Sequence, residues 1–273
     1  MDLTKTLELA FNSDVGRKRS HNEDSSAIDA SLGLLIIADG MGGYRAGEVA
    51  SAVAISTIVK HIQQRLHQLK PRQTDPETGF TMESILARDA LQEANFEVFR
   101  SAYDHSQFDG MGTTALIVLF YDNHFSVAHV GDSRLYRERN GQLVKITSDH
   151  SLRQELIDRG LYTQEEAEAK TPNHLVTRAL GINDVVNVDI FEDAVLPGDL
   201  FLLCTDGLTD MVDDTDIHLT LKKFSDNLNR TAQELIDLAN SRGGKDNISV
   251  ILARPRASFP ASGGWFDKIF GSN

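Results

Sequence analysis

Acidic residues recur in this sequence where apolar runs begin or end. Asp39 and Asp206 each follow an apolar run and precede a glycine, Asp246 stands just before the run that begins at Ile248, and Asp132 stands between two such runs. One Asp-Gly pair usually marks only a turn, but clustered carboxylates repel one another unless cations neutralise them. Oxygen ligands of this kind are those that Mg²⁺ and Mn²⁺ prefer. The pattern therefore indicates a divalent-cation site, if the fold brings these residues together.

A charged segment near the N-terminus adds cations to these acids. Residues 17–24 read Arg-Lys-Arg-Ser-His-Asn-Glu-Asp. A guanidinium can bind a phosphate through two hydrogen bonds, so Arg17 and Arg19 are candidates for phosphate binding. The alternative is a solvated loop that binds nothing.

Composition limits the class of protein that could carry such a site. The chain has 273 residues, of which 41% are hydrophobic and 25% charged, and this is enough apolar material for a packed core. The single cysteine excludes a disulfide framework and fits a reducing, cytoplasmic compartment. The net charge of −13 argues against nucleic acid as a partner. We expect no membrane span and no secretory signal, because no apolar run is long enough and the first residues lack the pattern of a signal peptide.

The order of the predicted elements indicates how the acids are positioned. Apolar runs bounded by turn residues predict strands over 6–14, 24–38, 113–121, 124–130, 133–138, 143–147, 186–192, 200–204 and 248–252. Apolar residues at helical spacing predict helices over 45–69, 81–105 and 230–241. Because most neighbouring strands are joined by short turns, the pattern favours an antiparallel α+β fold with helices on the outer faces of stacked sheets.

Two segments do not fit this scheme. Residues 149–181 are polar and helix-prone without a strong apolar face, which predicts an inserted, mobile segment. Residues 255–273 contain prolines, small residues and a short aromatic stretch, and we expect a flexible tail there, with a docking peptide as the alternative.

Six short motifs follow one another along roughly residues 7–253. They are Arg19-x3-Glu23-Asp24, Ala38-Asp39-Gly40-Met41-Gly42-Gly43, Gly110-Met111-Gly112-Thr113-Thr114, Val130-Gly131-Asp132-Ser133-Arg134, Thr205-Asp206-Gly207-Leu208 and Lys245-Asp246-Asn247. Each motif is weak alone, but the ordered set resembles the metal-dependent protein phosphatases of type 2C, in particular the compact bacterial serine/threonine phosphatases. The resemblance implies a four-layer α-β-β-α sandwich, in which two stacked antiparallel sheets are flanked by helix pairs. It also implies a catalytic domain over residues 1–254, with 149–181 as a flap that selects substrates.

The resemblance further implies a site of two or three Mn²⁺ or Mg²⁺ ions between the sheets. Its protein ligands would be Asp39, Gly40, Asp206, Asp246, Asp132, Glu23 and Asp24. Asp39 would bridge two ions and the Gly40 carbonyl would bind one of them, while Asp206 and Asp246 would complete the other. Asp132, with Asp206, would hold a third ion.

Glu23 and Asp24 would act mostly through water. Arg19 would bind the phosphate, because it and not Arg17 stands four residues before Glu23.

The implied reaction is hydrolysis of phosphoserine and phosphothreonine in proteins by a hydroxide that bridges two ions, with Arg19 stabilising charge on the phosphoryl oxygens. The implied partners are phosphoproteins and a serine/threonine kinase, and the protein would be a cytoplasmic monomer. One position departs from many eukaryotic relatives, which carry a proposed histidine proton donor where this chain has Met41. His21, His150 or a metal-bound water are the remaining candidates for that role.

Other readings of the sequence make different predictions. A cysteine-based phosphatase would need an arginine six positions after its cysteine, but six positions after Cys204 this chain has Asp210. The acids at 214–216 lack the pattern of a phosphoaspartate enzyme. A module that binds phosphoproteins without hydrolysing them, or a calcium-stabilised structural protein, would keep the fold without turnover. Hydrolysis assays distinguish these two readings from a phosphatase.

Overall fold

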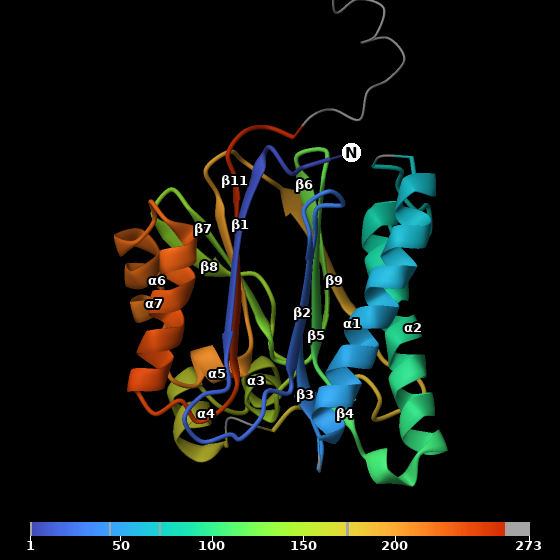
Figure 1. The fold of residues 1–273 in the computed structure, drawn as a ribbon, viewed down its shortest axis with the longest axis vertical. Helices are drawn as coiled ribbons and strands as arrows, with labels where there is room; N and C mark the ends of the chain where they lie inside the picture. The colour runs from blue at the N-terminus through green and yellow to red at the C-terminus, as the bar shows by residue number, and fades with distance from the viewer. Residues whose placement is uncertain (1, 44, 71, 173–174, 260–273) are drawn as a thin grey trace, which may run out of the picture.

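Two antiparallel sheets lie face to face in the computed structural model, which describes residues 2–43, 45–70, 72–172 and 175–259 (Figure 1). The first sheet has the order β1 (Leu7–Asp14), β11 (Ile248–Pro255), β10 (Leu200–Cys204), β7 (Arg134–Arg139) and β8 (Gln142–Lys145). The second has the order β2 (Asp24–Asp29), β3 (Leu34–Met41), β5 (Ala115–Tyr121), β6 (His124–Val130) and β9 (Asp189–Ala194), and the short β4 (Gly112–Thr113) pairs with β3. All of these strand pairs are antiparallel.

Helices cover the outer face of each sheet (Figure 1). The second sheet carries α1 (Ala46–Arg65) and α2 (Met82–Asp104), and the first carries α6 (Asp214–Lys223) and α7 (Leu228–Ser241). Shorter helices are α3 (Leu152–Asp158), α4 (Gln164–Lys170) and α5 (Asp206–Thr209), with 3₁₀ turns at Leu66–Gln68 and Ser106–Phe108. The predicted four-layer α-β-β-α sandwich is therefore confirmed.

The core has one apolar layer between the sheets and one beneath each helix pair. Strand β3 shows why its sequence is apolar throughout, since successive side chains of a strand point to opposite faces. Leu34 and Ile36 pack under α1 and α2, whereas Leu35 and Ile37 pack between the sheets. Because both faces of β3 are covered, each of its first five positions is a buried apolar residue, as the sequence predicted.

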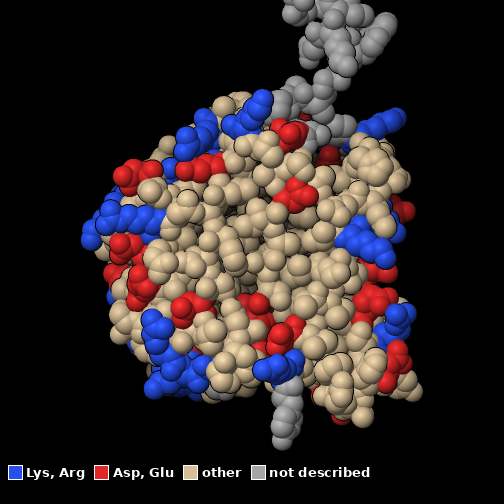
Figure 2. Space-filling view, in the orientation of Figure 1, with Lys and Arg blue, Asp and Glu red and all other residues tan. Residues whose placement is uncertain are grey.

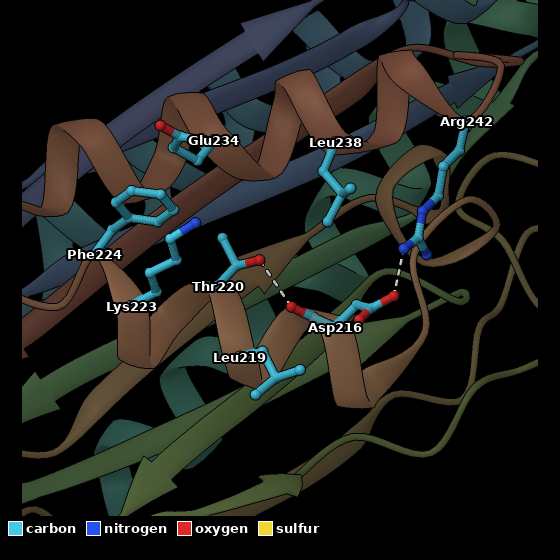
Figure 3. A pocket seen from close by; sticks show the side chains of 8 residues that line it. All are labelled: Asp216, Leu219, Thr220, Lys223, Phe224, Glu234, Leu238 and Arg242. Atoms are coloured by element: carbon cyan, nitrogen blue, oxygen red, sulfur yellow. Dashed lines mark hydrogen bonds and ion pairs between the residues drawn. The ribbon is translucent and has the colours of Figure 1, made fainter.

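Helix α6 was missed in the sequence, and its composition explains why. Only Ile217 and Leu221 are buried, one turn apart, in an otherwise polar segment that begins at the N-cap Asp213. The helix packs beside α7, and a groove of ≈ 280 Å³ lies between them, where Asp216 pairs with Arg242 (Figure 3). This groove shares no lining residue with the acidic pocket described below.

The segment 149–181 is joined to the sandwich at both of its ends. At its first end the His150 N–H donates to the Gly131 carbonyl at 3.0 Å, and at its other end Leu180 forms a β-bridge with Thr113 of β4. Within the segment, Ser151 forms an isolated β-bridge with Val176. Helices α3 and α4 lie in the loop that the Ser151–Val176 bridge closes, at the lower end of the sandwich in Figure 1. The segment therefore contains two short helices, as its helix-prone sequence suggested, and its ends are paired with the sandwich.

The start of the predicted tail packs on the core. Strand β11 reaches Pro255, and the Phe259 ring is buried with its centroid 6.0 Å from that of Phe120. The Phe259 backbone N–H donates to Asn123 Oδ1 at 2.6 Å. The packed body thus extends beyond the boundary predicted at 254, and the aromatic stretch of the tail lies outside the described residues.

The surface is mixed in charge. On the face seen in Figure 2, charged side chains of both signs lie mostly around the periphery, while the centre, over the strands of the two sheets, carries few of them. Within the described ranges, no helix is long and apolar enough to cross a membrane.

Candidate active site

An acidic pocket of ≈ 200 Å³ opens at one end of the sandwich. It is lined by the C-terminal end of β3, by Thr114 just after β4 and by the start of helix α5, elements that meet at the lower end in Figure 1. Its lining residues are Arg19, Glu23, Asp39, Gly40, Met41, Gly42, Thr114, Asp132, Val176, Asp206 and Asp246. The structure therefore brings together every site residue predicted from the sequence except Asp24.

Thr114 hydrogen-bonds to the backbone of Asp39 and to the side chain of Ser133, the residue after Asp132. The Asp39 backbone N–H donates to Thr114 Oγ1 at 3.0 Å, and the Asp39 carbonyl accepts from the Thr114 N–H at 2.8 Å. Thr114 Oγ1 also lies 2.8 Å from the hydroxyl of Ser133, which follows Asp132. Thr114 thus links the end of β3 to the turn between β6 and β7. It stands inside a motif noted in the sequence, but spacing alone assigned it no role.

Two glycines allow the segments around the pocket to approach closely. A Cβ atom on Gly40 would lie 2.1 Å from the Gly47 carbonyl oxygen in the first turn of α1. A Cβ atom on Gly207 would lie 1.9 Å from the carbonyl oxygen of Asn247. Any side chain at either position would push apart the backbones that carry the acids.

Asn247 fixes the loop before β2 against the start of β11. Its Nδ2 donates to the carbonyls of Val15 and His21, both at 2.9 Å, and its Oδ1 accepts from the Glu23 N–H at 2.8 Å. These bonds join positions more than 220 residues apart in the chain. Asn247 is the last residue of the Lys-Asp-Asn motif, yet its role as the connector is visible only in the fold.

Arg19 points into the pocket and pairs with an acid that was predicted to bind metal. Its Nη2 atom lies 2.6 Å from Asp246 Oδ2, and half of its side chain is exposed. This ion pair raises the pKa of Arg19, so the side chain is a permanent cation. A divalent cation bound at Asp246 would compete with Arg19 for the carboxylate.

Asp24 lies behind the pocket. In the register of β2 and β3 it is directly opposite Asp39. Its Oδ2 accepts hydrogen bonds from Ser249 Oγ at 2.6 Å and from Thr205 Oγ1 at 3.0 Å, whereas its buried Oδ1 has no hydrogen-bond partner. The position fits an acid that acts on the site from behind.

Burial and mutual repulsion disfavour charge on these acids. Burial, followed by the charges of neighbouring acids, raises the pKa of Asp24 to about 7 and that of Asp132 to about 8. The same causes raise the pKa of Asp206 to about 6 and hold that of Asp39 well above its usual range. These buried carboxylates can all be ionised at once only if positive charge beyond that of Arg19 is present in the pocket.

The donor set fits hard divalent cations that keep part of their hydration shell. Buried Oδ1 atoms of Asp24 and Asp206 lack hydrogen-bond partners. Within the described ranges, no three side chains of His, Cys, Asp or Glu lie close enough together to enclose an ion. Mg²⁺ usually retains several waters and uses only one or two carboxylates, so acids spread around a small cavity suit such ions.

The structure favours neither histidine as a proton donor. His21 Nε2 lies 3.4 Å from Glu23 Oε1, and His150 is buried outside the pocket. Neither ring lines the pocket, whereas Met41 does.

Comparison with known proteins decides the family. The profile of the family described as protein phosphatase 2C matches residues 16–246, a range that contains every predicted site residue from Arg19 to Asp246. The chain belongs to the protein phosphatase 2C family.

Similar members of the protein phosphatase 2C family come from several bacteria. The serine/threonine phosphatase stp of Listeria monocytogenes is 37% identical over 249 residues, which cover 90% of this chain and 95% of that protein. The serine/threonine protein phosphatase PstP of Mycobacterium tuberculosis is 37% identical over 251 residues, which cover 92% of this chain but 45% of that longer protein.

Solved structures of protein phosphatases share the fold. The crystal structure of Mycobacterium tuberculosis PstP/Ppp superposes with a TM-score of 0.80 at 34% identity, covering 91% of this chain and 98% of that chain. A structure of the PstP catalytic domain in complex with two manganese ions gives a TM-score of 0.77 at 35% identity, with the same coverage.

Proposed function

We propose that this protein phosphatase 2C is a metal-dependent serine/threonine phosphatase that hydrolyses phosphoserine and phosphothreonine in proteins. The observation that carries the proposal is the acidic pocket, in which five carboxylates and one arginine converge from segments far apart in the chain. Relatives that match nearly the full chain and are named serine/threonine phosphatases support the same reaction.

The proposed cofactor is a set of two or three Mn²⁺ or Mg²⁺ ions, supported by the two manganese ions of the PstP complex. The residues that would hold two of these ions are Asp39, the Gly40 carbonyl, Asp206 and Asp246. Asp132 would hold a third with Asp206, while Glu23 and Asp24 would act through water. When bound, such ions acidify a water molecule and neutralise charge on a phosphoryl group.

The chain's own residues bind and orient the substrate. Arg19, half exposed at the pocket wall, offers its guanidinium to two phosphoryl oxygens. Thr114 and Gly40 fix the backbone of Asp39, so its carboxylate needs little reorganisation during the reaction. Met41 contributes an apolar surface and no proton, so the leaving alkoxide must take its proton from elsewhere than this position.

The proposal extends to the setting of the reaction. We expect a cytoplasmic monomer that reverses the action of a serine/threonine kinase, in which residues 1–254 hold the catalytic machinery. The flap 149–181 would select substrates, because its Val176 lines the pocket.

Hydrolysis of p-nitrophenyl phosphate and of a phosphothreonine peptide tests the proposal directly. We expect activity with Mn²⁺ or Mg²⁺ that EDTA abolishes and fresh metal restores. The Asp39→Asn variant, which keeps the size of the side chain, is the matched control and should be inactive. If folded, metal-loaded protein hydrolyses neither substrate, a phosphoprotein-binding module is the better reading. If metal raises the melting temperature without any turnover, a calcium-stabilised structural protein becomes the better reading.

A further inference from the structure

A buried histidine joins the flap to the turn that carries Asp132. His150 is 2% exposed and follows Asp149 at the start of the flap. Its ring Nδ1 accepts a hydrogen bond from the Gly131 N–H at 3.0 Å, and its own backbone N–H donates to the Gly131 carbonyl at 3.0 Å. Both backbone polar groups of Gly131 are thus satisfied by one residue of the flap.

The other side of the ring faces an acid. Because Nδ1 accepts a hydrogen bond, it carries no proton in this arrangement, and a neutral ring must carry its proton on Nε2. Nε2 lies 3.2 Å from Asp189 Oδ2 at the start of β9. Asp189 Oδ1 lies 2.7 Å from Nη1 of Arg178 near the end of the flap. This contact lacks the geometry of a hydrogen bond, so Asp189 places a negative charge beside Nε2 while the bond to Gly131 orients the ring. Arg178 ties Asp189 to the flap.

The turn at Gly131 has little freedom of its own. Gly131 has φ of +108°, and a Cβ atom there would lie 2.5 Å from the Thr114 side chain. The turn is therefore confined between Thr114 on one side and His150 on the other. Asp132, the next residue, lines the acidic pocket. A shift of Gly131 would move the Asp132 carboxylate.

We propose that His150 is a positioning residue that sets the place of the Asp132 carboxylate and couples it to the flap. The inference rests on the proposed function, because it takes Asp132 to be a metal ligand. Groups that orient a metal ligand commonly change metal affinity by about 10–100-fold when they are removed. His150 acts through the backbone of Gly131 and touches neither substrate nor metal.

Two substitutions of similar shape separate positioning from packing. Asn Oδ1 stands at the place of the histidine Nδ1 and can accept from the Gly131 N–H. The Leu side chain has similar shape and no acceptor. We expect His150→Leu to weaken one Mn²⁺-binding step at least tenfold in calorimetry and to raise the Mn²⁺ concentration for half-maximal hydrolysis by a similar factor. His150→Asn should stay within about threefold of wild type in both.

Controls identify the affected binding step and the effect of stability. The Asp132→Asn variant shows which step of the Mn²⁺ titration depends on Asp132, and His150→Leu should weaken that same step. Leu235→Ala is a control for stability, because it opens a cavity in the core under α7, away from the site. It should lower the melting temperature and leave Mn²⁺ binding unchanged.

Two results would overturn the inference. One is wild-type Mn²⁺ binding in His150→Leu, and the other is equal weakening in the Leu and Asn variants. If the wild-type protein shows no hydrolysis at all, the proposed function fails, but the calorimetric comparison still decides the role of His150.

Discussion

In the metal-free protein, the acidic pocket should make the free energy of unfolding depend on pH. Burial, with help from neighbouring charges, holds the pKa of Asp132 at about 8 and that of Asp24 at about 7, against a usual value of 3.8. In the metal-free folded protein these groups therefore keep their protons at pH values where the unfolded chain has lost them. Because the folded state binds more protons, the free energy of unfolding falls as the pH rises toward these pKa values.

The size of the effect follows from counting protons. Each carboxyl that is protonated only in the folded state changes the folding equilibrium constant roughly tenfold per pH unit, on the order of 1 kcal/mol. Asp132 contributes this slope up to about pH 8 and Asp24 up to about pH 7. Burial also lowers the pKa of His129 to about 4 and lowers that of His61, so both rings make the fold more stable as the pH rises through 6.5 and oppose the carboxyl slope there. The carboxyl slope is therefore seen most clearly in the upper part of the window from pH 6.5 to 8.

Urea unfolding between pH 6.5 and 8 measures this slope. With EDTA, we expect the free energy of unfolding to decrease with pH. With saturating Mn²⁺ the slope should flatten or change sign, since bound cations favour ionised carboxylates. Asp132→Asn removes one titrating group and should reduce the slope in EDTA. Metal-free protein that becomes more stable as the pH rises, or equal slopes with and without Mn²⁺, would refute the reasoning.

Further substitutions test single contacts of the site. Asp39→Asn and Asp206→Asn should each abolish hydrolysis and raise the melting temperature of the metal-free protein, because each removes a buried carboxyl whose ionisation the fold disfavours; near-normal activity in either would contradict the metal assignment. Arg19→Ala should raise KM for a phosphothreonine peptide by about tenfold, since charge-assisted bonds to phosphate are lost, and an unchanged KM would remove Arg19 from the site. Gly207→Ala should lower the melting temperature and weaken Mn²⁺ binding in calorimetry, because its Cβ would lie 1.9 Å from the Asn247 carbonyl oxygen; a variant with wild-type binding would show that the turn can move without loss.

The sequence predicts the sandwich well because buried strands and helix faces consist of apolar residues, which can be recognised as apolar runs and spacings. Strand β3 is covered on both faces, so it reads as an uninterrupted apolar run, whereas α6 is covered on one side only and its two buried residues leave a weak pattern. The order of the elements then defines the layers, since short turns join most of the strands. Element type was therefore predictable wherever burial was extensive.

The sequence identifies the acids of the site but does not predict how they are arranged in space. Residue type and motif order point to Asp39 and Asp206, but the hydrogen bonds that hold the pocket connect distant positions through backbone groups. Asn247 binds the carbonyl of Val15, and no spacing rule relates two residues so far apart. Asp24 shows the same limit, because the pairing of β2 with β3 places it opposite Asp39, yet its carboxylate is held by Ser249 and Thr205 and does not line the pocket.

The place of β11 has a consequence for how the chain folds during synthesis. Among the described residues this is the last strand, and it lies between β1 and β10, so β1 pairs with a segment that leaves the ribosome after every other strand described. The second sheet, by contrast, has all its strands once residue 194 has emerged. Pairings between the two ends of a chain form slowly because they close the longest loops. The sheet that carries Asp206 and borders Asp246 is thus completed last, and a nascent chain should gain its helix-covered second sheet well before it can assemble the acidic pocket.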